Sequence, residues 1–245
     1  MGLRKVVVTG AAGKIAGLLL PALQERYDLT LLDVHTRDRN GNKVLGIQAA
    51  DLLNRERDTY RQYFQGADAV VHCALVGAND PEQRFWAELK NLQMTYNVYQ
   101  TAWEEKVHRV VAASSCQAAN YYEPLILAGK WDFVSPSART LATSYYGWAK
   151  EACEHLGFVF AVARVNDRRL ENVQIRIGGP RETDVARCPK GDLTCVRRAL
   201  AAYISQRDLQ QLFVKSIEAE DIRDEHGVPF QIFYGISNNP HAFWS

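Results

Sequence analysis

The chain has 245 residues, of which 47% are hydrophobic, and its 29 Lys and Arg residues nearly balance 28 Asp and Glu residues. This length and apolar content suffice for one well-packed domain with a small appended lobe. Because the charge is balanced, the composition favours neither nucleic acid nor an anionic membrane as a partner. The N-terminus lacks the apolar stretch of a signal peptide, and no run approaches the roughly 20 apolar residues of a membrane-spanning helix. These features predict a soluble, cytoplasmic protein.

The first two thirds of the chain alternate between short apolar runs and longer periodic segments, which are typical of strands and helices. Strands are predicted at residues 5–9, 29–34, 44–49, 69–73, 109–113 and 173–177. Helices are predicted at residues 15–23, 60–64, 81–105 and 144–162. Pro21 lies inside the first helix and is expected to kink it. Strands separated by helices imply right-handed crossovers, so the sequence predicts an α/β fold with a Rossmann-type, doubly wound parallel sheet.

The last third of the chain is less regular. Residues 178–194 are rich in Gly, Pro and charged side chains and predict a loop. Helices are predicted at residues 196–204 and 208–219, and a late strand at residues 229–234. We therefore expect residues 1–178 to form a nucleotide-binding domain and residues 179–245 to form a small C-terminal substrate lobe.

Five cysteines occur at irregular spacings, at positions 73, 116, 153, 188 and 195. None belongs to a Cys-x-x-Cys pair or to a Cys/His cluster with the spacing of zinc ligands. We therefore expect buried or free thiols, no bound metal, and a reducing compartment.

A glycine-rich turn, TGAAGKIA, follows the first predicted strand and opens a helix. Gly10 suits a tight turn, Gly13 lets the backbone approach a pyrophosphate, and Ala16 keeps the helix close to the sheet. The helix N-terminus, where Lys14 and Ile15 lie, offers N–H groups to the phosphates. Glycine turns between a strand and a helix are common, so a purely structural turn is the alternative. The context of strand, turn and helix favours a dinucleotide site.

Acidic and apolar residues that follow later strands extend this site. Asp33 ends the second strand about 20 residues after the turn, where a carboxylate binds the adenosine ribose hydroxyls and repels a 2′-phosphate. The cofactor is therefore predicted to be NAD, although Lys14, Arg37 and Arg39 leave NADP open unless they form only a solvated rim. Further cofactor-binding candidates follow strands three and four, namely Asp51, Leu52, Ala74 and Leu75. A plain surface loop is the alternative for Asp51.

A phenol and an ammonium are four residues apart in YGWAK, so Tyr146 and Lys150 share one face of a helix. Ser114 and Ser115 follow the fifth strand, at the edge of the sheet where the glycine turn also lies. A neighbouring cation favours the phenolate form, which can accept the proton of an alcohol as hydride leaves for the nicotinamide. We therefore predict that Ser115 orients the substrate and that Tyr146 is the base. Lys150 also holds the nicotinamide ribose.

The pattern Tyr-x-x-x-Lys alone is nearly uninformative, because an exposed helix face produces it equally well. Tyr145 is a competing phenol, but no lysine follows it four residues later. The order of glycine turn, acid, serine, tyrosine and lysine along the chain is much more specific. This order predicts an oxidoreductase.

These segments, from TGAAGKIA and LLDV through ADL, AVVHCA and AASS to YYGWAK, resemble the extended short-chain dehydrogenase/reductase superfamily, that is, the NAD-dependent epimerase/dehydratase family. Within it the chain is most similar to uronate dehydrogenases, through SSCQAANYY, VQIRIGGP, YISQRDLQQLFVKSIEA and FQIFYGISNN. The resemblance implies NAD-dependent oxidation of the anomeric carbon of a sugar acid in the cytoplasm. It also implies cofactor contacts from Asn91 and Ile177, and a homodimer through helices at 82–105 and 145–162.

Several positions depart from the uronate dehydrogenase pattern. Cys116 stands where those enzymes have a polar residue after the catalytic serine, and Gly77 and Gly179 stand where they have serines. Arg198 matches their carboxylate-binding arginine. The alternative is that Arg198, like the neighbouring Arg197, is only an exposed cation on a helix. A site that loses polar partners changes its substrate more readily than its reaction. Ser115, Cys116 and Arg198 are therefore the predicted substrate contacts, and the sugar or sugar acid is left open.

Two other functions compete with a dehydrogenase. A nucleotide-sugar epimerase or dehydratase usually needs a larger C-terminal lobe than the residues after the sixth strand provide. A non-catalytic dinucleotide sensor often lacks the tyrosine or the lysine, and this chain keeps both.

Overall fold

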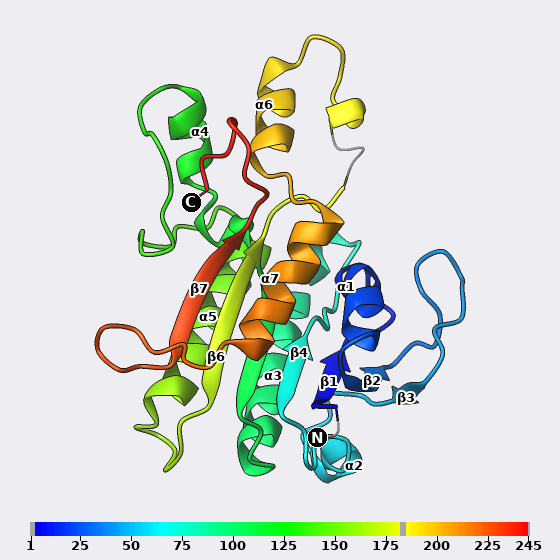
Figure 1. Cartoon of the computed structure of the whole chain (residues 1–245). Helices are drawn as coiled ribbons and strands as arrows, with labels where there is room; N and C mark the ends of the chain where they lie inside the picture. The colour runs from blue at the N-terminus through cyan, green and yellow to red at the C-terminus, as the bar shows by residue number, and fades with distance from the viewer. Residues whose placement is uncertain (1–2, 182–184, 245) are drawn as a thin grey trace.

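The computed structural model describes residues 3–181 and 185–244. Its centre is a seven-stranded sheet with the order β3-β2-β1-β4-β5-β6-β7, in which all neighbouring strands are parallel (Figure 1). The strands are β1 (Lys5–Thr9), β2 (Asp28–Asp33), β3 (Ile47–Ala49), β4 (Ala69–His72), β5 (Arg109–Ser115), β6 (Glu171–Ile177) and β7 (Phe230–Gly235). The chain winds outward from β1 in both directions, which confirms the predicted doubly wound Rossmann sheet.

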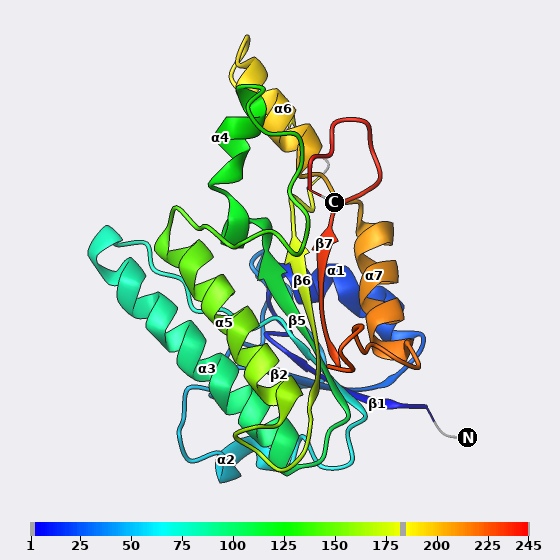
Figure 2. The same cartoon turned by 90° about the vertical axis from the view of Figure 1, so that its left-hand side faces the viewer.

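Helices cover both faces of the sheet, and Figure 2 shows the sheet between them. The α-helices are α1 (Lys14–Gln24), α2 (Asp58–Arg61), α3 (Arg84–Glu104), α4 (Tyr122–Leu127), α5 (Tyr145–Val162), α6 (Leu193–Ala201) and α7 (Gln206–Glu218). Short 3-10 helices are η1 (Pro81–Gln83), η2 (Cys116–Ala119) and η3 (Val185–Arg187). In the described part of the chain, no helix is long and apolar enough to cross a membrane.

Alternate residues of each central strand enter two different cores. Val6 and Val8 pack on the side of α1 and α7, whereas Val7 packs on the side of α3 and α5. Because both faces of the strand are covered, its side chains form a continuous apolar run rather than an alternating one. Phe213 fills the first core and Tyr99 the second, and both are fully buried. This packing fixes the carboxyl ends of the strands, where the candidate site lies.

Several elements differ from the sequence-based expectations. The third strand begins at Ile47 instead of Val44, and η1 precedes α3 in the segment expected to be one helix. The helix α1 continues through Pro21, and the side chains of Gln206 and Gln210 from α7 donate to the Leu18 carbonyl oxygen. Pro21 lacks the N–H that would donate to the Gly17 carbonyl oxygen, and the two glutamines bind the adjacent carbonyl of Leu18 in the same turn.

A smaller lobe, which we call the substrate lobe after its expected role, lies above the carboxyl ends of the strands, where α4 and α6 stand beside the C-terminal residues 236–244 (Figure 2). A separate apolar cluster holds it together, with contributions from Cys116, Tyr122, Ala201 and Trp244. The helix α4 was not predicted from the sequence. Both α7 and β7 extend the Rossmann layers, although they follow the expected domain boundary at residue 178.

The prediction that all five cysteines are thiols is wrong for two of them. Cys188 and Cys195 form a disulfide across seven residues, between the loop before α6 and the first turn of that helix. Cys73, Cys116 and Cys153 are free. The spacing did not indicate this pair, because a loop whose path is not known from the sequence brings the two sulfur atoms together.

Candidate active site

A cavity of about 950 Å³ lies at the carboxyl ends of β1, β2 and β4. It is lined by most of the residues that we predicted to bind the cofactor, namely Gly10, Gly13, Lys14, Ile15, Asp33, Asp51, Leu52, Ala74 and Leu75. Parallel open sheets bind ligands at such an edge, where the strand order reverses on either side of the first strand. The cavity position therefore agrees with a dinucleotide site.

The glycine turn has no room for side chains. Gly10 has a φ of +68°, and a Cβ atom there would lie 2.5 Å from the backbone N and Cα atoms of Ala74. The Gly13 N–H donates to the Gly10 carbonyl oxygen at 2.8 Å, and Gly13 leaves the N-terminus of α1 without a side-chain cap. The first N–H groups of a helix have no acceptor within it, and they face a ligand at this end. This backbone cradle fits a pyrophosphate.

Asp33 connects the second strand to the glycine turn. Its carboxylate accepts hydrogen bonds from the backbone N–H of Ala12 at 3.0 Å and of His35 at 2.9 Å, and it lines the cavity. A carboxylate at this place fits the ribose hydroxyls of NAD. The cations Arg37 and Arg39 also line the cavity, and the Arg37 guanidinium donates to the Gly41 carbonyl oxygen at 2.8 Å.

Four predicted cofactor contacts, Asn91, Ile177, Tyr146 and Lys150, are not among the residues that line the cavity. The buried Asn91 amide accepts from the Val76 N–H at 2.7 Å and donates to the Val76 carbonyl oxygen at 2.9 Å, so it holds the loop after β4. Ile177, the last residue of β6, is buried in the core on the α1 side. Asn91 therefore supports the cavity wall, and Ile177 belongs to the sheet beside it.

The three predicted catalytic residues converge at the end of β5. Ser115 is the last residue of β5 and is 8% exposed, and its Oγ accepts from the Gln117 N–H at 3.2 Å. The Lys150 ammonium donates to the Ala113 carbonyl oxygen of β5 at 2.7 Å and lies 5.7 Å from the centre of the Tyr146 ring. The lysine therefore stands between the tyrosine and the strand that ends in the serine.

The ammonium of Lys150 also reaches the end of β4. Burial lowers the pKa of His72 to about 3, and the Lys150 charge adds to the decrease. Burial raises the pKa of the Cys73 thiol to about 12, and the same ammonium opposes this effect. Cys73 lines the cavity, whereas Ser115, Tyr146 and Lys150 are not among its lining residues.

A missing side chain allows the start of α5 to approach η2. Ser144 caps the helix by accepting the Gly147 N–H at 3.1 Å, which fixes Tyr146 on the first turn. A Cβ atom at position 147 would collide with the Gln117 carbonyl oxygen. Only glycine therefore allows the turn that carries Tyr146 to pack directly against the segment after Ser115.

A buried charged network behind the tyrosine was not predicted from the sequence. Glu154, two turns after Tyr146, accepts from both Nε and Nη2 of Arg176 on β6, at 2.9 and 2.8 Å, and from the Ser114 hydroxyl at 2.5 Å. Arg176 is 1% exposed and also donates to the Tyr234 hydroxyl oxygen at 3.0 Å. The network ties α5 to β5, β6 and β7. A charged residue within the apolar runs VQIRI and ACEHLGF was the one sequence feature that could have indicated it.

Two of the predicted substrate contacts, Cys116 and Arg198, already have partners within the protein. The Cys116 thiol is buried and donates to the Arg176 carbonyl oxygen at 3.4 Å, so it turns toward β6. The Arg198 guanidinium is paired with Glu123 of α4, a partner that the sequence did not reveal. Within residues 3–181 and 185–244, no group of three or more His, Cys, Asp or Glu side chains is arranged to hold a metal ion.

Comparison with known proteins places the chain among nicotinamide-dependent enzymes. Residues 6–163 match the model of the NAD dependent epimerase/dehydratase family. The L-arabinose 1-dehydrogenase (NAD(P)(+)) of Haloferax volcanii is 30% identical over 88% of this chain and 83% of that protein. The uronate dehydrogenase of Pseudomonas syringae pv. tomato is 24% identical over 98% of this chain and 77% of that protein.

Solved structures share the fold. The glucuronic acid dehydrogenase from Chromohalobacter salexigens superposes with a TM-score of 0.77 at 23% identity, covering all of this chain and 80% of that one. The family model covers the glycine turn, the serine and the Tyr/Lys helix, which are the residues that carried the sequence resemblance. The chain therefore belongs to the NAD dependent epimerase/dehydratase family.

Proposed function

We propose that this protein is an NAD-dependent dehydrogenase that oxidises the anomeric hydroxyl of a sugar or sugar acid. The observation that carries the proposal is the position of Lys150, which bonds to β5 and lies beside the ring of Tyr146. The relatives named L-arabinose 1-dehydrogenase and uronate dehydrogenase support the substrate class. These relatives, and not the serine, tyrosine and lysine alone, favour a dehydrogenase over the epimerase alternative.

The residues of the glycine turn would hold the pyrophosphate of the cofactor, and Asp33 the adenosine ribose. When bound, NAD supplies the acceptor for the hydride that leaves the anomeric carbon. Asp51, Leu52, Ala74 and Leu75 line the same cavity and would contact the adenine and the nicotinamide half. Asn91 would act through the loop that it holds.

In this proposal, Ser115 at the end of β5 and Tyr146 and Lys150 on α5 carry out the proton transfer. The Ser115 hydroxyl accepts the Gln117 N–H and retains its own hydrogen, with which it orients the substrate oxygen. The Tyr146 oxygen accepts the proton of the anomeric hydroxyl, and the nearby Lys150 ammonium stabilises the phenolate that begins the step. The sugar loses one proton and one hydride, and it becomes a lactone.

The experiment that tests this function follows nicotinamide absorbance while purified protein is incubated with NAD and a panel of aldoses, uronic acids and sugar phosphates. Reduction of NAD by one class of sugar is the expected result. If no sugar is oxidised, and if the protein instead binds and converts a nucleotide sugar with retention of its cofactor, the epimerase alternative replaces this proposal.

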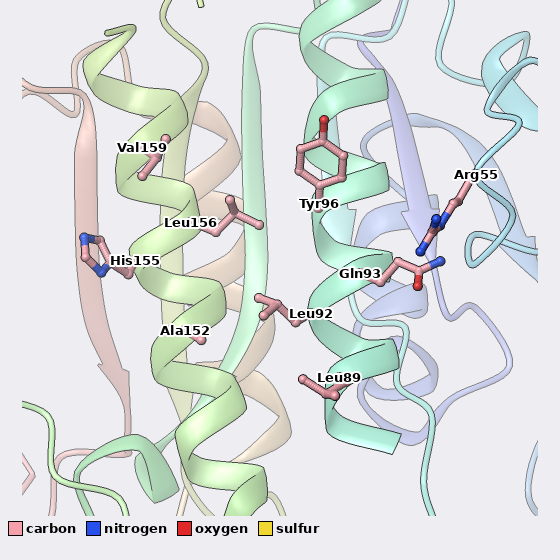
Figure 3. A pocket seen from close by; sticks show the side chains of 9 residues that line it. All are labelled: Arg55, Leu89, Leu92, Gln93, Tyr96, Ala152, His155, Leu156 and Val159. Atoms are coloured by element: carbon pink, nitrogen blue, oxygen red, sulfur yellow. The ribbon is translucent and has the colours of Figure 1, made fainter. Parts of the chain in front are cut away.

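We also propose that the protein is a homodimer. A groove of about 610 Å³ runs between α3 and α5, and Figure 3 shows Leu89 and Leu92 on one wall and Leu156 and Val159 on the other. Tyr96, which also lines the groove, is exposed. Apolar grooves of this kind are usually covered, and a second copy would place the same two helices against them by twofold symmetry.

Light scattering tests the dimer. Twice the 27.6 kDa mass of the chain is expected for the wild type, and the single mass for Leu92→Lys. A wild-type monomer at micromolar concentration would exclude this interface.

A cytoplasmic location is the last part of the proposal; the three free cysteines agree with a reducing compartment, whereas the Cys188–Cys195 disulfide does not. Alkylation of thiols in intact cells tests it. Because disulfides rarely persist in the cytoplasm, we expect Cys188 and Cys195 to be labelled there. A pair that stays oxidised in cells would indicate an oxidising compartment.

A further inference from the structure

An ion pair bridges the two helices of the substrate lobe. The Nε atom of Arg198 on α6 lies 2.7 Å from Oε1 of Glu123 on α4. The Glu123 side chain is 13% exposed, whereas that of Arg198 is 50% exposed. Burial raises the pKa of the Glu123 carboxyl, and the Arg198 charge opposes the increase. The positive charge of the arginine is therefore already compensated from the buried side.

The pair lies at the same end of the sheet as the catalytic serine. Cys116, the residue after that serine, packs in one cluster with Tyr122 of α4 and Ala201 of α6. Glu123 directly follows Tyr122, and Arg198 lies about one helical turn before Ala201. Burial raises the pKa of the Cys116 thiol, and the charge of Glu123 adds a smaller increase.

Arginine commonly binds carboxylates, and the resemblance to uronate dehydrogenases gives Arg198 that role toward a substrate. To bind a sugar acid, Arg198 has two options. It can leave Glu123, which strands a largely buried carboxylate without its cation, or it can be shared, which brings two carboxylates together. Both options are costly, because buried unpaired charges and juxtaposed like charges each destabilise a complex by several kcal/mol. The uncharged C6 hydroxymethyl group of an aldose causes neither kind of destabilisation.

We propose that the Glu123–Arg198 pair makes this site selective for an uncharged aldose over the corresponding uronic acid, an inference that rests on the proposed dehydrogenase function. Two neighbouring positions agree with it. The Cys116 thiol donates inward to the Arg176 carbonyl oxygen, and Gly179 has no side chain. Neither offers a hydroxyl to a substrate carboxylate.

The test uses sugars that differ only at C6, namely galactose against galacturonate and glucose against glucuronate. The ratio of kcat/KM within each pair is measured for the wild type, Glu123→Gln, and the double variant Glu123→Gln/Arg198→Gln. Asp221→Asn serves as the control, because it removes a carboxylate from the exposed Asp221–Arg223 pair outside the substrate lobe.

We expect the wild type to prefer the aldose. Glu123→Gln releases the arginine, so the ratio should shift toward the uronic acid by roughly tenfold or more. The double variant should lose this shift toward the uronic acid, because the freed arginine is what binds the acid. The control, Asp221→Asn, should leave the ratio unchanged. A wild type that prefers the uronic acid, or a Glu123→Gln variant with an unchanged ratio, overturns the inference.

Calorimetric titration of the NAD-saturated proteins with galactose and galacturonate separates this inference from the proposed function. If no variant oxidises any sugar, the proposed function fails. In that case, tighter galacturonate binding by Glu123→Gln than by the wild type still supports the role of the ion pair, and equal binding overturns it as well.

Discussion

The cofactor cavity and the substrate lobe are built in different ways. The cavity is shaped by backbone: Gly10 touches Ala74, and Gly13 closes the turn on the Gly10 carbonyl oxygen. The lobe is held by side chains from distant segments, such as the Glu123–Arg198 pair and the cluster around Cys116. The glycine turn itself is local and closes on its own backbone before it packs against Ala74, whereas the lobe depends on pairs of side chains far apart in the sequence.

The two regions should therefore tolerate substitutions to different degrees. A backbone cradle leaves few substitutions possible, because any Cβ atom at Gly10 meets main-chain atoms. A lobe held by side chains can exchange one partner for another without disturbing the sheet. Substitutions in the two regions should therefore have distinct effects, and four predictions test this distinction.

The largest effect is expected at the boundary between the two regions. Tyr146→Phe removes the proton acceptor, and kcat should fall by roughly 10²–10⁴-fold. NAD affinity, measured by fluorescence titration, and thermal stability should change little. Tyr145→Phe is the matched control, because its ring is 57% exposed and packs on Phe85. Equal losses of kcat in the two variants would remove Tyr146 from its proposed role.

The next effect concerns the buried network that joins α5 to β5, β6 and β7, behind the boundary of the two regions. Arg176→Met leaves Glu154 buried without its cation, so the free energy of unfolding should fall by about 3–5 kcal/mol. Urea unfolding followed by circular dichroism measures the change. Arg223→Met breaks an exposed pair and should leave the free energy of unfolding nearly unchanged. A similarly small change for Arg176→Met would show that the network does not tie α5 to the sheet.

Within the cofactor region, Gly10→Ala should destabilise the protein by roughly 1–3 kcal/mol and abolish NAD binding, because the new Cβ atom meets the Ala74 backbone in a left-handed conformation. Gly17→Ala in α1 is the control. A Cβ atom there has no neighbour within 4 Å, and a helical glycine gains roughly 0.4–1 kcal/mol on replacement by alanine. Retention of NAD affinity by Gly10→Ala would contradict the proposed cradle.

The smallest effect is a pH dependence of stability from His72. The ring is buried between the Thr9 and Thr95 hydroxyl groups, and its pKa is lowered to about 3 from 6.5. The unfolded chain therefore binds a proton that the folded chain does not, so stability is present above about pH 6.5 and decreases as the pH falls below it. His72→Gln should make the free energy of unfolding depend less on pH over this range. Urea unfolding measured between pH 7 and pH 5, at intervals of roughly one pH unit, tests this. An unchanged slope would exclude His72 as its origin.

The sheet was predicted well because its information is local. The run KVVVT is apolar on both faces, and β1 has the predicted bounds, Lys5–Thr9. The glycine turn, the acid and the Tyr/Lys pair were likewise recognised by spacing, and the structure gathers them at one edge of the sheet. The sequence placed Asn91 near the site, but only the structure shows that it acts by holding Val76 in the loop after β4.

The substrate lobe was predicted poorly because its contacts are not local. The helix α4 has six residues, YEPLIL, too few to show helical periodicity and interrupted by Pro124. Glu123 and Arg198 are far apart in sequence, and no pattern connects them. Cys188 and Cys195 are near one another, but only the path of the intervening loop shows that they form a disulfide.

The most direct test of the central claim follows a hydrogen atom from the sugar to the cofactor. An aldose deuterated at C1 is oxidised with NAD, and mass spectrometry locates the label. The deuterium should appear on the reduced nicotinamide in the wild type, with transfer nearly abolished in Tyr146→Phe. Reduced nicotinamide that carries no deuterium, or a product that is changed at another carbon while C1 keeps its label, would contradict hydride transfer from the anomeric carbon.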